Sequence, residues 1–247
     1  YPQGAADGVF AARMARNGFT GAAGVPEWFS QRTRGKSSDF NLDLRPDRFR
    51  ILNVGLKRFP LQFELQTIAE AGVELHPGLK ERLGDIREIL VETSERAKEA
   101  TASPSRYEPE TKESADHSLP ICLALALIDG DVTVDQFEHD RWRAADIRAL
   151  ARKIRVEVGE SAKAAARGSS ESLVRVTLAS GEAFERRIAI PDGDPRRPMS
   201  PAALQSKFMQ FAAPVLGEAR AMQLLDACNR LESLHDIRQL TGLFTPA

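Results

Sequence analysis

The sequence predicts an α+β protein in which an all-helical domain, incomplete here, is interrupted by an α+β domain containing a small antiparallel sheet. Apolar residues follow helical spacing at both ends of the chain, strand-like segments alternate with helices between them, and residues 173–190 form a hairpin pattern. We expect residues 1–45 to end the helical domain, 46–199 to form the α+β domain, and 200–247 to return to the helical domain.

The first segment, residues 5–17, is predicted to be a helix that stops at an Asn-Gly pair. A second short helical stretch is expected at 26–29. Residues 32–48 are polar and contain Gly and Pro, which is typical of a loop or a joint between domains. A new unit therefore begins near residue 46.

The middle of the chain opens with a predicted strand at 49–56, which is short and rich in large or β-branched apolar residues. A helix at 63–75 and a strand at 86–93 follow, and the charged, proline-containing stretch 98–112 is expected to be a loop. Residues 118–128 are almost continuously apolar and end at an Asp-Gly pair, which predicts a helix buried on every side.

Two short helices are predicted at 135–139 and 144–151, followed by an alternating strand at 154–158. The segments 173–178 and 183–190 flank a Ser-Gly pair, so they form the clearest hairpin. These segments bring the number of expected strands to five.

The tail is helical from residue 200 onward. Ser200 before Pro201 places a capping residue ahead of a proline at the first helical position. Because a helix of about 13 residues at the start cannot build a core with this tail alone, the helical part is expected to lack a partner segment. The first residue, Tyr1, likewise indicates a processed or truncated chain.

Charge, apolar runs and cysteine content reduce the number of functional classes to consider. With 34 Lys and Arg against 35 Asp and Glu, the net charge is −1, so nucleic acid and anionic membranes are not expected partners. The longest apolar run, 119–128, is about half of a membrane span, and no export signal opens the sequence. Cys122 and Cys228 have no CxxC neighbours, which excludes a disulfide framework. We therefore expect a cytoplasmic protein.

Common catalytic motifs are absent from the sequence. No GxSxG, GxGxxG, P-loop or HExxH pattern occurs, so no motif supports a serine-hydrolase, nucleotide-binding or zinc-protease function. The histidines never fall at metal-ligand spacing. The sequence therefore predicts neither a metal nor another cofactor.

The segment Lys57-Arg58-Phe59-Pro60 is the first candidate site. Two cations lie at the end of an expected strand, where Pro60 prevents its continuation. Cations at the end of an element can bind a substrate carboxylate, but solvated charges beside a turn are the more common case for such a pair. The residues alone leave both interpretations open.

The triplet Asp116-His117-Ser118 is the second candidate. It precedes the most apolar helix, whose free N–H groups Asp116 or Ser118 can cap. A structural cap is the leading interpretation. Alternatively, the nearby helix N-terminus favours the neutral imidazole of His117, which suits a general base. Cys122, on the same helix, is expected to be a core residue and not a nucleophile.

Several segments, taken in order and spacing over nearly the whole chain, resemble the MmgE/PrpD family of dehydratases, decarboxylases and epimerases. They are residues 8–12 with 18–21, 55–60, 115–120 with 126–130, and 198–208. Family members are about twice as long, so this chain resembles their second half. The resemblance implies that the catalytic Asp and His of the first helical half are absent here, and that this half is the partner.

The resemblance also assigns roles to residues. Lys57 matches the lysine of the family motif K-[RLY]-[FY]-P and is expected to hold a substrate carboxylate or an enolate-like intermediate. Arg58, Gln62 and His117 are the expected substrate-binding residues. Gln62 replaces a His of the decarboxylase branch and Ile121 replaces its Tyr, which argues against cis-aconitate decarboxylation.

The implied reaction is the metal-free elimination of water from a 2-methylcitrate-like hydroxy-polycarboxylate, as in propionate metabolism, by a homodimer. A base removes a proton next to a carboxylate and an acid assists the departure of hydroxide. An epimerase or isomerase of the same family would instead return the proton.

A non-catalytic or truncated half that binds a helical partner is the alternative from another class. The apolar residues that would form its interface are Ala6, Val9, Phe10, Met14, Phe208 and Phe211.

Overall fold

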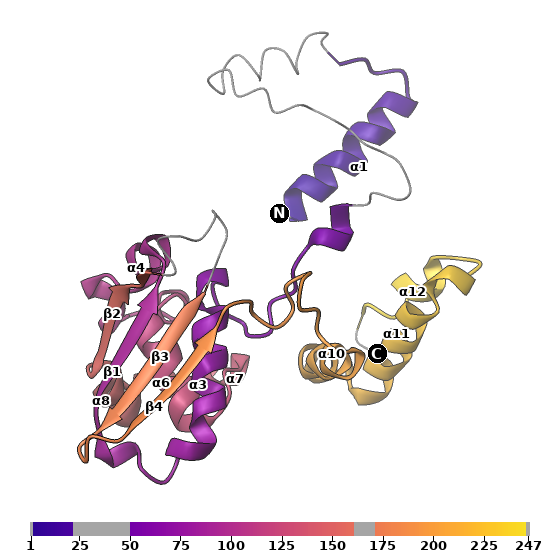
Figure 1. The fold of residues 1–247 in the computed structure, drawn as a ribbon. Coiled ribbons are helices and arrows are strands. Elements are labelled where there is room, and N and C mark those ends of the chain that lie inside the picture. Colours follow the sequence, from indigo (N-terminus) through magenta and orange to yellow (C-terminus); the bar gives the residue numbers. More distant parts are fainter. Residues whose placement is uncertain (1, 22–49, 161–170, 246–247) are drawn as a thin grey trace. The chain divides into compact units, whose positions relative to one another are not determined.

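The computed structural model describes residues 2–21, 50–160 and 171–245 (Figure 1). The chain divides into two compact units, Tyr1–Arg50 and Ile51–Ala247. No helix in the described ranges is long and apolar enough to cross a membrane.

The first unit contains helix α1 (Pro2–Arg16), which confirms the helix predicted at the start of the chain. The side chain of Asn17 donates a hydrogen bond to the carbonyl of Arg13 (2.9 Å), and Gly18 adopts φ +87°, so the Asn-Gly pair ends the helix as expected. The predicted helix at 26–29 and joint at 32–48 lie outside the described residues.

The second unit is built on a four-stranded sheet with the strand order β2-β1-β3-β4. The strands are β1 (Ile86–Thr93), β2 (Ile154–Val158), β3 (Ser172–Leu178) and β4 (Ala183–Ile188). The hairpin β3-β4 turns at Gly181, with φ +90°, and confirms the predicted hairpin. The α+β fold class is therefore confirmed.

The sheet is mixed, which corrects the expectation of an antiparallel one. Strand β1 pairs antiparallel with β3 but parallel with β2, with Val91 opposite Val156. The cause is the connection: after β1 the chain runs through several helices before it returns as β2, and such a crossover allows two neighbouring strands to point the same way.

Helices cover one face of the sheet (Figure 1). Helix α3 (Gln66–Leu79) packs on β3 and β4, and α6 (Leu119–Asp129) packs on α3 and on α8 (Ala145–Ala151). The other short helices before the hairpin are α4 (Glu95–Thr101), α5 (Lys112–Ala115) and α7 (Val134–Glu138). The tail helices α10 (Pro201–Leu216), α11 (Glu218–Asn229) and α12 (Arg238–Thr241) lie apart from the sheet, where α11 packs on both α10 and α12. Helix α6 is buried along nearly its whole length, as predicted, and ends at Gly130 in the left-handed conformation. It is the centre of the core.

Two segments differ from the sequence-based expectation. The strand predicted at 49–56 is a short 3-10 helix, η2 (Arg50–Asn53), followed by irregular backbone, so the described residues contain four strands and not five. Its side chains Leu52 and Val54 are exposed, since no neighbouring strand pairs with them. The loop predicted at 98–112 contains the end of α4, which Ser94 caps, the 3-10 helix η5 (Pro104–Tyr107) and the first residue of α5.

Helices α3 and α6 approach each other closely at Gly72. A Cβ atom at Gly72 would lie 2.7 Å from the Cβ of Ala126 and 2.9 Å from a methyl group of Leu123, both well inside van der Waals contact. We expect Gly72→Ala to lower the free energy of unfolding by about 1–3 kcal/mol, because overpacking forces the helices apart. Urea unfolding tests this, with Gly84→Ala as control, since a Cβ at Gly84 meets nothing within 4 Å. A Gly72→Ala protein as stable as wild type would contradict the close approach.

Candidate functional site

The segment that carries Lys57 is held by a loop that is distant in sequence. The N–H of Leu56 donates a hydrogen bond to the carbonyl of Gly193 (2.8 Å). Gly193 has φ +92°, and a Cβ there would lie 2.0 Å from the carbonyl oxygen of Leu56. Only glycine satisfies both conditions, so Gly193 fixes the backbone just before Lys57.

The side chain of Gln66 fixes the backbone just after Lys57. Gln66 is 2% exposed, and its Oε1 accepts the N–H of Phe59 (3.0 Å). Its Nε2 donates to the carbonyls of Phe59 (3.1 Å) and Leu61 (3.4 Å). A buried amide that makes these bonds orders the backbone on which Lys57 and Arg58 stand. Sequence reasoning missed Gln66, because its partners are backbone atoms and the sequence shows no pattern that links it to them.

Lys57 itself is exposed, and its Nζ donates to the carbonyl of Leu61 (2.8 Å). The carbonyl of Lys57 accepts a hydrogen bond from the Nζ of Lys207 on α10. Burial, and then the positive charge of Lys57, lower the pKa of Lys207. Sequence reasoning also missed Lys207, because 150 positions separate it from Lys57 and no local pattern links them.

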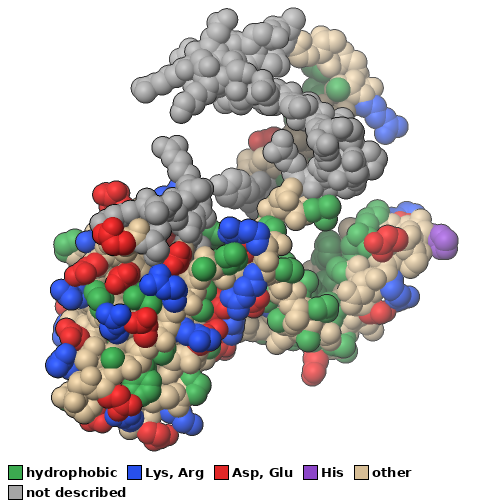
Figure 2. Space-filling view, in the orientation of Figure 1, with side chains coloured by type: hydrophobic (Ala, Val, Ile, Leu, Met, Phe, Trp, Pro, Cys, Tyr) green, Lys and Arg blue, Asp and Glu red, His purple; other side chains and the backbone are tan. Residues whose placement is uncertain are grey.

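Arg58 is half-buried and lies with its guanidinium carbon 4.8 Å from the centre of the Phe59 ring. In the part of the chain that the structure describes, Lys57, Arg58 and Lys207 have no carboxylate partner. Many other arginines of the unit do have one, as in the pair of Arg175 with Glu185 (2.6 Å). Positive and negative side chains are accordingly interspersed on this unit (Figure 2). The three cations therefore form an unpaired group, which suits an external anion.

A polar cavity of roughly 350 Å³ lies beside this group. Its charged and hydrogen-bonding lining residues are Arg58, Asp131, Asp192, Ser206, Lys207 and Gln210. Its volume is near the lower end of the range for small-molecule sites. Lys57 is not among the lining residues, so the cavity extends the Lys57 site and is distinct from it.

A backbone hydrogen bond connects the chain just after the Lys57-Arg58-Phe59-Pro60 segment to the Asp116-His117-Ser118 triplet. The N–H of Gln62 donates to the carbonyl of Asp116 (3.4 Å), and the Oε1 of Gln62 is buried without a hydrogen-bond partner among the described residues. Ser118, and not Asp116, caps α6: its Oγ accepts the N–H of Ile121 (3.2 Å). An unpaired amide oxygen five positions after Lys57 is a candidate acceptor for a ligand hydroxyl.

His117 takes a different position. Its Nδ1 is hydrogen-bonded to a carboxylate oxygen of Asp116, its side chain is 44% exposed, and it does not line the polar cavity. The substrate-binding roles of Arg58, Gln62 and His117 stay predictions. No group of three or more His, Cys, Asp or Glu in the described ranges is placed to hold a metal ion.

Cys122 is fully buried on α6, and its Sγ donates to the carbonyl of Ala115 (3.4 Å). Burial raises the pKa of this thiol well above its ordinary value. Cys228 is exposed. We expect iodoacetamide in mildly alkaline buffer to alkylate Cys228 alone in the folded protein, and both cysteines after unfolding, as mass spectrometry can read. Rapid alkylation of Cys122 in the folded protein would show that its surroundings are open.

The described structure is thus an α+β domain with cations that lack carboxylate partners beside a polar cavity. The sequence model of the MmgE/PrpD C-terminal domain matches residues 59–231, and the chain therefore belongs to the MmgE/PrpD family. The matched range begins directly after Lys57 and Arg58. The chain is also similar to cis-aconitate decarboxylase from Homo sapiens, at 24% identity over 191 residues that cover 77% of this chain and 40% of that protein. It thus spans less than half of that relative.

Proposed function

We propose that this chain is the C-terminal part of a lyase that removes water from a 2-methylcitrate-like hydroxy-polycarboxylate. The observation that carries the proposal is the group of Lys57, Arg58 and Lys207, three cations without carboxylate partners in the described structure, beside a polar cavity. Such a group fits a substrate with several carboxylates. Membership of the MmgE/PrpD family and similarity to a decarboxylase support a lyase.

In the proposed reaction, a base removes the proton next to a carboxylate, and the electron pair of the C–H bond moves toward that carboxylate. The Lys57 ammonium stabilises the enolate-like charge, and the planar Arg58 guanidinium binds a carboxylate through two parallel hydrogen bonds. The C–O bond then breaks, a C=C bond forms, and the hydroxide leaves as water with a proton from a general acid. We assign that base and acid to the N-terminal helical half of the family.

Two residues favour dehydration over decarboxylation: Gln62, five positions after Lys57, and Ile121 on α6. Gln62 carries an amide and Ile121 an alkyl group, so neither side chain titrates in the range of enzymatic proton transfer. Ile121 is also completely buried. Neither position therefore offers a group that could protonate the carbanion left by loss of CO₂.

Proton NMR of 2-methylcitrate in D₂O with the complete enzyme tests the proposed reaction. We expect the substrate to disappear as an alkene signal rises. Exchange of the substrate proton for deuterium without an alkene would identify the epimerase or isomerase instead. Release of CO₂ from cis-aconitate, or no reaction at all, would contradict a dehydratase.

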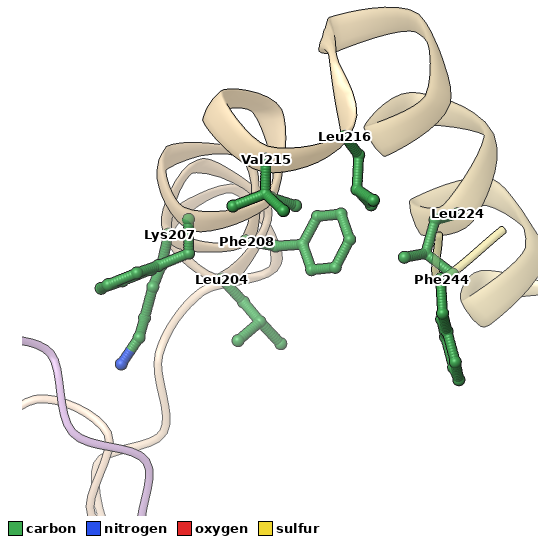
Figure 3. Close-up of a pocket in the computed structure, with 9 residues that line it drawn as sticks. Leu204, Lys207, Phe208, Val215, Leu216, Leu224 and Phe244 are labelled. Carbon is green, nitrogen blue, oxygen red and sulfur yellow. The ribbon is translucent and has the colours of Figure 1, made fainter. Parts of the chain in front are cut away.

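We further propose that an N-terminal helical half of the family covers the tail helices. An apolar groove of roughly 570 Å³ lies on α10 and α11, and Figure 3 shows the Phe208 ring near Leu216, with Leu224 and Phe244 across from it. Phe211 and Val215, which also line this groove, are exposed. Exposed apolar surface of this kind is typical of an interface.

Native mass spectrometry of the purified material tests the partner. We expect a helical polypeptide bound to this chain, or covalently continuous with it, and two copies of the whole in a homodimer. A chain that stays monomeric, free of aggregates and fully active by itself would contradict the proposal. A complex that forms but performs no chemistry on any of the acids above would favour the non-catalytic alternative.

A further inference from the structure

The side chain of Lys207 lines both the apolar groove and the polar cavity. Its aliphatic stem lines the apolar groove, and its ammonium lies 6.0 Å from the centre of the Phe211 ring. Figure 3 shows the ammonium pointing away from Phe208 and Leu216. At that end Lys207 donates to the carbonyl of Lys57 and lines the polar cavity. The ammonium is therefore held in the cavity wall by packing of its own stem.

One face of α10 forms this wall. Ala203, Ser206, Lys207 and Gln210 all line the cavity, and their spacing of three and four positions places them on the same side of a helix. The hydroxyl of Ser206 and the amide of Gln210 flank the ammonium as neutral hydrogen-bonding groups. The face thus presents one fixed charge with neutral donors beside it, which is a suitable arrangement for an oxyanion.

Residues outside α10 supply a second cation and two acids to the lining of the cavity. Arg58 faces the cavity with its guanidinium stacked on Phe59. Asp131 accepts the N–H of Val132 (2.8 Å), and within the described residues neither Asp131 nor Asp192 pairs with Arg58 or Lys207. Both cations are therefore available to a ligand, while the two carboxylates limit the number of anionic groups that the cavity can accept.

We propose that this cavity is a carboxylate subsite. In it, Lys207 and Arg58 bind a second carboxylate of the substrate, while Lys57 binds the carboxylate next to the carbon that loses its proton. The inference rests on the proposed function and adds to it a binding residue from α10. Removal of water from Lys207 by burial is offset when an anion binds, because the anion restores a favourable interaction for the charged amine.

Lys207 could instead act only by holding the Lys57 backbone, so the test must separate the two roles. We would measure the citrate affinity of the full chain by calorimetry for wild type, Lys57→Gln, Lys207→Gln and the double variant. If each lysine binds its own carboxylate, each single change weakens binding by about tenfold and the double change by about a hundredfold, since independent effects on the binding free energy add. Lys207→Arg should keep most of the affinity.

Lys98→Gln, the same change at an exposed lysine of α4, is the matched control and should leave the affinity unchanged. Loss of the Lys207→Gln effect in the Lys57→Gln background would overturn the subsite, because Lys207 would then act only through Lys57. An undiminished affinity in Lys207→Gln with a loss in Lys57→Gln would overturn the subsite but leave the proposed function standing. A wild-type chain that does not bind citrate would contradict both.

Discussion

Lys57→Ala is expected to lower kcat of the complete enzyme by about 10²-fold or more. The Lys57 ammonium is the group that meets the charge developing on the substrate carboxylate, and removal of such a charge-stabilising donor has an effect of this size. The loss should appear mainly in kcat, because the charge is greatest in the transition state. Steady-state kinetics of the dehydration measures it.

The control for this prediction is Lys98→Ala, which removes a lysine that is exposed on α4. Its kcat should equal that of wild type within about twofold, as for most exposed positions remote from a site. Near-normal turnover in Lys57→Ala would contradict the role assigned to Lys57, whatever substrate the enzyme proves to use.

Gln66→Ala is expected to lower the free energy of unfolding by about 3 kcal/mol. The substitution leaves the buried N–H of Phe59 without its partner, and an unsatisfied buried polar group costs about 1–3 kcal/mol. It also removes the hydrogen bonds that Gln66 donates to the carbonyls of Phe59 and Leu61, although the Phe59 carbonyl keeps the N–H of Leu61 as a donor. Denaturant unfolding measures the change.

Gln205→Ala is the matched control for Gln66→Ala. Gln205 is exposed on α10, so its removal should change the free energy of unfolding by less than about 0.5 kcal/mol. Equal stability of Gln66→Ala and wild type would mean that water or another group readily replaces the amide of Gln66, and the order of the Lys57 segment would need another source.

The parts of the fold that the sequence predicts correctly are those with local causes. The helix around Cys122 follows from an uninterrupted apolar run between a Ser cap and a Gly stop, and the hairpin follows from two alternating segments around Gly181. Parallel pairing of β1 with β2 has no local signal, because it depends on how the intervening helices cross the sheet. The false strand at 49–56 has suitable residues but no partner strand in the described structure.

Some residues of the candidate site can be predicted from local sequence, and others cannot. Lys57 and Arg58 were visible in the sequence because the cations adjoin a proline in a short segment that resembles a family motif. Gln66, Gly193 and Lys207 were not, because their role lies in contacts with backbone atoms that belong to other elements. A sequence displays side-chain types, whereas a backbone hydrogen bond over 150 positions appears only in the folded structure.

The central claim is that Lys57, Arg58 and Lys207 form a carboxylate-binding site on this chain. The most direct measurement is NMR of the chain with ¹⁵N-labelled lysine and arginine side chains during a citrate titration, with signals assigned by Lys57→Arg and Lys207→Arg. We predict saturable shifts of the Lys57, Arg58 and Lys207 side-chain signals at one common affinity, and none for Lys98. Saturation by citrate that leaves these three signals unmoved, or the absence of any shift, would contradict the account.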